Sequence, residues 1–192
     1  MRIIGGTARG RRLQTPAKSH GKYSGHLIRP TADRAREALF NIIGKEVENA
    51  VVLDLYAGTG ALGLEALSRT AERAVFVDNS LQAVKIINKN IELCGFSARA
   101  LVLRSDLSKG LAFLGKKLPG ITFSIVFVDP PYGKGFSAEV LHELTDSDLL
   151  FPEALVVVEE NVFADLGAKV ARLTLIDQRR YGETGFWFYR HN

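Results

Sequence analysis

The sequence predicts an α/β fold around an open, mostly parallel, doubly wound sheet. Segments typical of strands alternate with segments typical of helices from about residue 46 onward. The first strand, residues 51–55, is a continuous apolar run, as expected for a strand buried on both faces. A glycine-rich turn and a helical segment follow it directly. These three observations favour a Rossmann-like sheet that binds ligands at the carboxyl ends of its strands.

The expected elements follow in a regular order. Residues 2–4 and 12–14 flank a glycine-rich, basic turn and predict a small N-terminal hairpin. A helix over residues 32–43 has Thr31 as its expected N-cap and Gly44 as its stop. Strands are expected at 51–55, 73–77, 100–103, 123–128 and 155–159, helices at 61–69, 81–94, 108–118 and 138–144, and a terminal antiparallel pair at 173–177 and 186–189. We therefore expect a seven-stranded sheet, with residues 1–28 as a basic arm and residues 29–192 as one domain.

Length and composition exclude several classes of protein. A chain of 192 residues with 46% hydrophobic and 24% charged residues predicts one globular domain rather than a disordered chain. A single cysteine excludes an internal disulfide and a multi-cysteine zinc site. No apolar run approaches the roughly 20 residues that span a bilayer, and the first residues lack a signal-peptide core. We expect a cytoplasmic monomer that uses no metal and binds no membrane.

Positive charge is concentrated at the N-terminus. The net charge is only +4, but residues 1–45 hold ten Lys and Arg residues against two acidic ones. This asymmetry predicts a polyanionic partner such as RNA, whose phosphates the basic segment would neutralise. The candidate contacts are Arg9, Arg11, Arg12, Arg29, Arg34 and Arg36. For Arg34 and Arg36, an ion pair with Asp33 or Glu37 is an equally good interpretation.

The turn after the first strand is the first candidate binding site. Gly58, Gly60 and Gly63 match the G-x-G-x-x-G pattern, which alone would suggest a dinucleotide. Asp54 and the small turn fit S-adenosylmethionine better, because that cofactor has an ammonium group and no pyrophosphate. The predicted cofactor contacts here are Asp54, Tyr56, Ala57, Gly58, Thr59 and Gly60. A glycine-rich turn without a ligand is the alternative.

Acidic residues also end the second and third strands. Asp78, followed by Asn79, stands where doubly wound folds hold ribose hydroxyls, although it could instead cap the next helix. Asp106 could accept from the adenine amino group beside the main-chain N–H of Leu107, or it could be an ordinary N-cap. Both are therefore candidate cofactor contacts.

The most specific motif is Asp129-Pro130-Pro131-Tyr132, at the end of the fourth strand. The two prolines restrict the backbone and lack N–H donors, so the Pro130 carbonyl is expected to be an acceptor beside the Asp129 carboxylate. Tyr132 offers a flat face for a stacked base. Two acceptors that hold an exocyclic amine would favour its attack on a methyl group. This arrangement predicts methyl transfer to a planar amine, with all four residues in the catalytic site.

The sequence resembles the RsmD family of bacterial 16S ribosomal RNA (guanine-N2)-methyltransferases. The match includes residues 1–6, the Arg-Pro-Thr block at residues 29–41, residues 53–69 and the Asp-Pro-Pro-Tyr motif, and it covers essentially the whole chain. Relatives often carry Glu where this chain has Asp78. The resemblance implies a Rossmann-like class I methyltransferase fold, S-adenosylmethionine as methyl donor with S-adenosylhomocysteine as product, and a guanine N2 amine of small-subunit rRNA as acceptor. It further implies a substrate that is an assembled or assembling subunit.

Three other functions remain open at this point. Asp-Pro-Pro-Tyr motifs also serve amino-methyltransferases that act on DNA adenine N6 or on protein glutamine N5. A glutamine enzyme would more often carry Asn at Asp129, and a DNA enzyme would usually need a larger recognition domain. A non-catalytic assembly factor that binds S-adenosylmethionine is the third possibility, and the intact motif argues against it.

Overall fold

The computed structural model describes residues 1–16, 30–131 and 135–192. The predicted boundary between arm and domain at residues 28 and 29 therefore lies outside the described residues. Within the described parts, no helix is long and apolar enough to cross a membrane. The elements are α1 (Pro30–Ile43), η1 (Gly44–Val47), β1 (Val51–Leu55), α2 (Ala61–Ser68), β2 (Arg73–Asp78), α3 (Leu81–Cys94), β3 (Ala100–Arg104), η2 (Leu107–Lys109), α4 (Ala112–Lys117), β4 (Phe123–Val128), α5 (Phe136–Thr145), β5 (Leu150–Asn161), β6 (Lys169–Val170), β7 (Leu173–Tyr181) and β8 (Thr184–His191).

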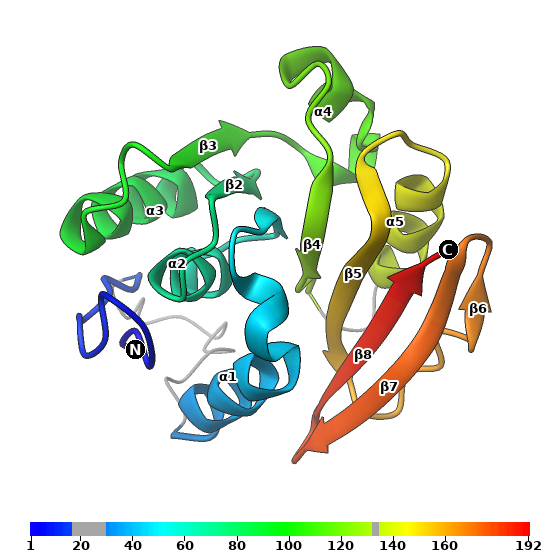
Figure 1. Ribbon diagram of the computed structural model, residues 1–192, viewed down its shortest axis with the longest axis horizontal. Coiled ribbons are helices and arrows are strands. Elements are labelled where there is room, and N and C mark those ends of the chain that lie inside the picture. Colours follow the sequence, from blue (N-terminus) through cyan, green and yellow to red (C-terminus); the bar gives the residue numbers. More distant parts are fainter. Residues whose placement is uncertain (17–29, 132–134) are drawn as a thin grey trace.

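All the strands belong to one sheet, in the order β3-β2-β1-β4-β5-β8-β7-β6 (Figure 1). Strands β1 to β5 pair in parallel, and β6 to β8 are antiparallel to their neighbours. The chain moves outward from β1 to β3 and then returns to place β4 on the other side of β1. The reversal of strand order makes the carboxyl ends of β1 and β4 the switch point, where folds of this type bind ligands.

The predicted doubly wound fold is confirmed, but the prediction of seven strands is wrong. Within the described residues the sheet has eight strands, because the two-residue β6 pairs with β7. So short a strand has no periodicity that a sequence pattern could reveal. The expected helix over 108–118 is also divided, since Gly110 has φ 87° and separates η2 from α4.

Helices cover both faces of the sheet. Helices α1, α2 and α3 pack in one buried apolar cluster, together with alternate residues of β1, β2 and β4. The cluster on the other face contains residues of η2, α4 and α5. Side chains alternate between faces along a strand, so Val52 and Asp54 lie on the α2 side while Leu53 and Leu55 point to the α5 side.

The N-terminal segment, defined here as residues 1–14, packs against α2 and α3. An antiparallel bridge joins Arg2 and Arg12, in keeping with the predicted hairpin. Ile3, Ala8 and Leu13 are buried in the α2-side cluster. The segment is thus part of the packed body, although its arginines still face solvent.

Candidate active site

The candidate site lies at the switch point between β1 and β4. Leu55 of β1 pairs with Val128 of β4, so the residues that follow each strand lie side by side. The Asp129 main-chain N–H approaches the Leu55 carbonyl at 3.5 Å. The register therefore brings the glycine-rich turn next to the Asp129 motif.

The turn between β1 and α2 has an unusual backbone. Tyr56, Gly58 and Gly60 have φ angles of 57°, 56° and 76°. This left-handed conformation costs glycine little but strains a tyrosine, and such strain is concentrated at functional sites. The Tyr56 ring stacks on Phe136 with centroids 6.3 Å apart. A Cβ built at Gly58 would meet only the Tyr56 carbonyl, at 3.8 Å, among the described residues, so a ligand could approach the main chain closely there.

Asp54 lies buried beneath this turn. Its Oδ2 accepts a hydrogen bond from the Gly63 N–H in the first turn of α2, at 2.9 Å. Gly63 is needed for this close approach, since a Cβ there would lie 2.4 Å from the Phe76 ring. Burial raises the pKa of Asp54 to about 7, against the lowering effect of the Gly63 hydrogen bond and with a smaller raising effect from Asp78. A cation above the turn would favour the ionised carboxylate.

Asp78 shapes the turn from the end of β2. Its Oδ2 accepts from the Gly58 N–H at 2.9 Å and its Oδ1 from the Ser80 N–H at 2.8 Å. The N-cap of α3 is Ser80, whose hydroxyl accepts from Ala83, so Asp78 does not cap that helix. A carboxylate has about four acceptor positions, which leaves capacity for a vicinal diol.

The remaining cofactor candidates lie around the ends of β2 and β3. Asp106 is the N-cap of η2, because its Oδ1 accepts from the Ser108 N–H and hydroxyl. These two hydrogen bonds lower the pKa of Asp106. The Leu107 side chain is buried in the α5-side cluster, and Asn79 is exposed after β2. The capping alternative for Asp106 is thus present, and its contact with adenine stays a prediction.

Asp129 is half-buried in an acidic environment. Burial raises its pKa well above the ordinary value, and the charges of Glu159, Asp54 and Glu160 raise it further. Pro130 is buried and Pro131 is exposed. Tyr132 lies outside the described residues. The site can therefore place a carboxyl group in a partly dry position, where an approaching cation would promote its ionisation.

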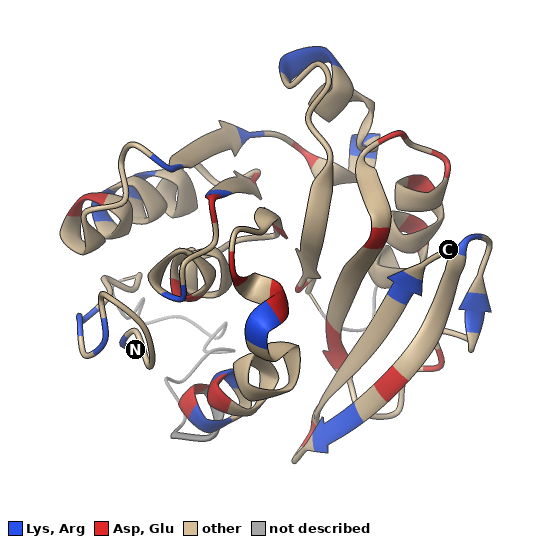
Figure 2. Cartoon of the chain, in the orientation of Figure 1, with Lys and Arg blue, Asp and Glu red and all other residues tan. Residues whose placement is uncertain are grey.

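The predicted RNA contacts differ in their surroundings. Arg9, Arg11 and Arg12 are exposed on the N-terminal segment, and Arg34 is exposed on α1. Figure 2 shows basic residues on both elements. Arg29 lies outside the described residues. The exposed arginines therefore remain candidates for contact with a polyanion.

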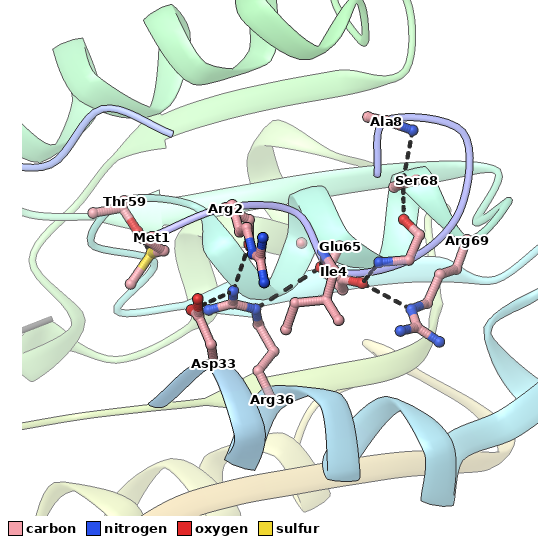
Figure 3. Close-up of polar contacts among 12 residues, drawn as sticks. Met1, Arg2, Ile4, Ala8, Asp33, Arg36, Thr59, Glu65, Ser68 and Arg69 are labelled. Atoms are coloured by element: carbon pink, nitrogen blue, oxygen red, sulfur yellow. Dashed lines mark hydrogen bonds and ion pairs between the residues drawn. The ribbon is translucent and has the colours of Figure 1, made fainter. Parts of the chain in front are cut away.

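Arg36 is buried, and the structural alternative holds for it. Its Nη2 donates to the Arg2 carbonyl at 2.6 Å and to Asp33 Oδ1 at 3.0 Å, and its Nε lies 3.8 Å from Glu65 Oε2 (Figure 3). The buried face of α1 contains Phe40, whereas Ile42 is 37% exposed. Arg36 lies on this buried face and therefore points inward. We therefore remove Arg36 from the candidate RNA contacts.

Sequence reasoning missed three polar residues that organise the site. Glu65 is fully buried in α2, where it accepts from the main-chain N–H groups of Ile4 and Gly5 (Figure 3). Asn90 of α3 is buried between the glycine-rich turn and the N-terminal segment. The charge of Glu159, which lies on β5, raises the pKa of Asp129. A lone acid in the otherwise apolar α2 was a signal for Glu65, because buried charges require partners.

The hydrogen-bond acceptors at the site fit one kind of cofactor. Carboxylates lie at or near the carboxyl ends of three neighbouring strands, at Asp54, Asp78 and Asp106. They would repel the pyrophosphate of a dinucleotide, whereas they suit an ammonium group, a diol and an amino group. The residues present therefore fit S-adenosylmethionine better than a dinucleotide.

Comparison with known proteins identifies the family. Residues 1–190 match the family described as Conserved hypothetical protein 95. The chain belongs to this family. Ribosomal RNA small subunit methyltransferase D of Escherichia coli is 37% identical over 99% of this chain and 89% of its own length. The resemblance to the RsmD family is thereby confirmed.

Solved structures have the same fold. The Escherichia coli protein yhhF superposes with a TM-score of 0.81 and 35% identity, over 100% of this chain and 98% of its own. The protein SMU.776, solved in complex with S-adenosylhomocysteine, has a TM-score of 0.69 at 15% identity, over 85% of this chain and 50% of its own. At that identity the second likeness bears on the fold alone.

Proposed function

We propose that this protein transfers a methyl group from S-adenosylmethionine to the exocyclic N2 amine of a guanine in the 16S rRNA of the small ribosomal subunit. The observation that carries the proposal is the register of β1 with β4, which sets the Asp129 motif beside the glycine-rich turn. The relatives named as small-subunit rRNA methyltransferases support rRNA as the substrate class. The guanine N2 assignment rests on the family resemblance and on the chemistry of the motif.

The cofactor would lie across the carboxyl ends of β1, β2 and β3. Asp54 would accept from its ammonium group, Asp78 from its ribose hydroxyls and Asp106 from its adenine amine, while Gly58 and Gly60 allow close approach of the main chain. The bound cofactor supplies an electrophilic methyl group on a sulfonium. Its positive charge would lower the raised pKa values of Asp54 and Asp129. Cofactor binding would thus prepare the acceptor that the reaction needs.

Asp129 and the Pro130 carbonyl would hold the two hydrogens of the guanine amine. The lone pair of that nitrogen is delocalised into the ring, and two acceptors favour the tetrahedral geometry in which it can attack. The amine nitrogen would take the methyl group from the bound sulfonium, which would leave as the thioether S-adenosylhomocysteine, and the Asp129 carboxylate would accept the proton that the methylated amine loses. Tyr132 would stack on the base, which must leave its own stack to enter the site.

The exposed arginines would hold the RNA. Arg9, Arg11, Arg12 and Arg34 would contact phosphates, together with Arg29, and such contacts position a substrate without reading its sequence. Contacts of this kind suit folded rRNA in an assembled subunit, because its surface offers phosphates in a fixed arrangement. We further propose that the protein acts as a monomer in the cytoplasm.

Labelled S-adenosylmethionine tests the substrate class. We expect methyl incorporation into small subunits that lack the modification, and none into large subunits or DNA. Asp129→Ala is the matched control, because it removes the carboxylate, and it should incorporate no label. Label in ribosomal protein or in DNA would favour the alternative amino-methyltransferases, and cofactor binding without transfer would favour the assembly factor.

A further inference from the structure

The N-terminal segment is attached to the body by main-chain hydrogen bonds to three polar side chains. Glu65 accepts from the N–H groups of Ile4 and Gly5 at 2.8 and 2.7 Å. Ser68 accepts from Ala8 and donates to the Gly5 carbonyl at 2.6 Å (Figure 3). These bonds fix the course of the segment along α2, independently of its exposed side chains.

The third attachment, Asn90, also reaches the glycine-rich turn. Its Oδ1 accepts from the Gln14 N–H at 2.7 Å, and its Nδ2 donates to the Gln14 carbonyl at 3.0 Å. The same Nδ2 donates to the Thr59 carbonyl at 2.9 Å. The side chain is fully buried, and its amide uses both donors and an acceptor. One amide therefore joins two pieces of main chain that are 45 residues apart in the sequence.

Thr59 lies at the centre of the candidate cofactor turn. Two further hydrogen bonds hold the turn: the Gly58 N–H donates to Asp78, and the Gly60 N–H donates to the Ala57 carbonyl at 2.7 Å. The Thr59 hydroxyl lies 3.3 Å from the Met1 sulfur (Figure 3). The N-terminal segment is therefore linked to Thr59 at its first residue directly and at Gln14 through Asn90. A displacement of either part would disturb the other through these contacts.

We propose that Asn90 is a positioning residue that ties the N-terminal segment to the cofactor turn, so that binding at one is energetically coupled to binding at the other. The proposal rests on the proposed function for the identity of the two ligands, S-adenosylmethionine and rRNA. The coupling is reciprocal: RNA bound to residues 1–14 would further restrain the Thr59 carbonyl through Asn90, and cofactor on the turn would further restrain the segment that carries Arg9, Arg11 and Arg12.

Isosteric replacement separates this role from simple packing. Asn90→Asp keeps the shape but turns an acceptor toward the carbonyls of Gln14 and Thr59. Asn90→Ser is a neutral second variant that can donate to only one of them. Asn88→Asp is the matched control, because Asn88 is exposed on the same helix and, among the described residues, its side chain donates to the Val84 carbonyl of that helix.

The test is calorimetric binding of S-adenosylhomocysteine to the full-length chain, alone and with unmodified small subunits. We expect both Asn90 variants to bind it about tenfold more weakly than the wild type, as loss of a buried hydrogen bond predicts. The ratio of affinities with and without subunits should move toward one, while Asn88→Asp changes neither value. Variants that melt at lower temperature yet bind within about twofold of the wild type would overturn the proposal.

Hydrogen exchange in the wild type provides a measurement that needs no variant. S-adenosylhomocysteine bound at the turn should slow hydrogen exchange of the Gln14 amide, which donates to Asn90 Oδ1. Unchanged protection of this amide would also overturn the proposal. If subunits fail to bind the wild type, the rRNA assignment fails, while affinity for S-adenosylhomocysteine and Gln14 protection still decide the role of Asn90.

Discussion

Asp54→Asn should make the protein more stable at alkaline pH and a poorer binder of cofactor. Burial raises the pKa of Asp54 from 3.8 to about 7 in the folded chain. The folded state therefore retains the proton over a pH range in which the unfolded chain has released it. Stability contributed by the neutral carboxyl is present at low pH and is lost as pH rises toward 7.

The size of this effect follows from the shift. Three pKa units, at about 1.4 kcal/mol each, correspond to about 4 kcal/mol of stability lost between pH 4 and pH 8. An asparagine at this position stays neutral and can still accept from the Gly63 N–H, but its amide N–H₂ group would lack an assured partner, at a cost of about 1–3 kcal/mol. The cost of the unpaired amide does not depend on pH. The decisive quantity is therefore how the difference in free energy of unfolding between Asp54→Asn and the wild type changes with pH.

Urea unfolding between pH 5 and pH 8 measures this difference. We expect the free energy of unfolding of Asp54→Asn to rise relative to the wild type as pH increases, and to level off above pH 7. The exposed Asp146, which follows α5, provides the control Asp146→Asn, because it removes a carboxylate charge outside the turn. Affinity for S-adenosylmethionine should fall about tenfold or more in Asp54→Asn, because a neutral amide holds an ammonium group less well. A stability difference that is constant across this pH range would refute the reasoning.

Three further predictions concern the reaction and the RNA. Asp129→Ala should abolish turnover and leave calorimetric cofactor affinity nearly unchanged; loss of cofactor binding would mean that Asp129 holds the cofactor instead. Glu159→Gln should move the acid limb of the kcat–pH profile to lower pH, because the Glu159 charge raises the pKa of Asp129; a limb that stays in place would count against Asp129 as the ionised acceptor. Replacement of Arg9, Arg11 and Arg12 by alanine should weaken subunit binding and reduce the slope of log K against log salt by about 2–3. An unchanged slope would exclude these residues as phosphate contacts.

The sequence predicted the parallel strands and the carboxylates at their ends, because both follow from local patterns. Buried strands are continuous apolar runs, and Asp54, Asp78 and Asp129 lie in or directly after such runs. The strand order then brings Asp54 and Asp129 together without any further information.

Contacts between distant parts of the chain could not be predicted in this way. Ile4 and Glu65 are 61 residues apart, and Gln14 and Asn90 are 76 residues apart. Each contact pairs an unremarkable main-chain group with one buried polar side chain, so no local pattern marks it. The inward position of Arg36 likewise depends on how α1 is rotated against the sheet, and the local sequence left its RNA contact and its ion pair equally open.

The identity of the methylated nucleoside tests the central claim most directly. Unmodified small subunits would be incubated with the protein and isotopically labelled S-adenosylmethionine, and the rRNA would be digested to nucleosides for mass spectrometry. We predict that the label appears in N2-methylguanosine and that Asp129→Ala removes it. Label in N6-methyladenosine, or in protein with none in the RNA, would contradict the account.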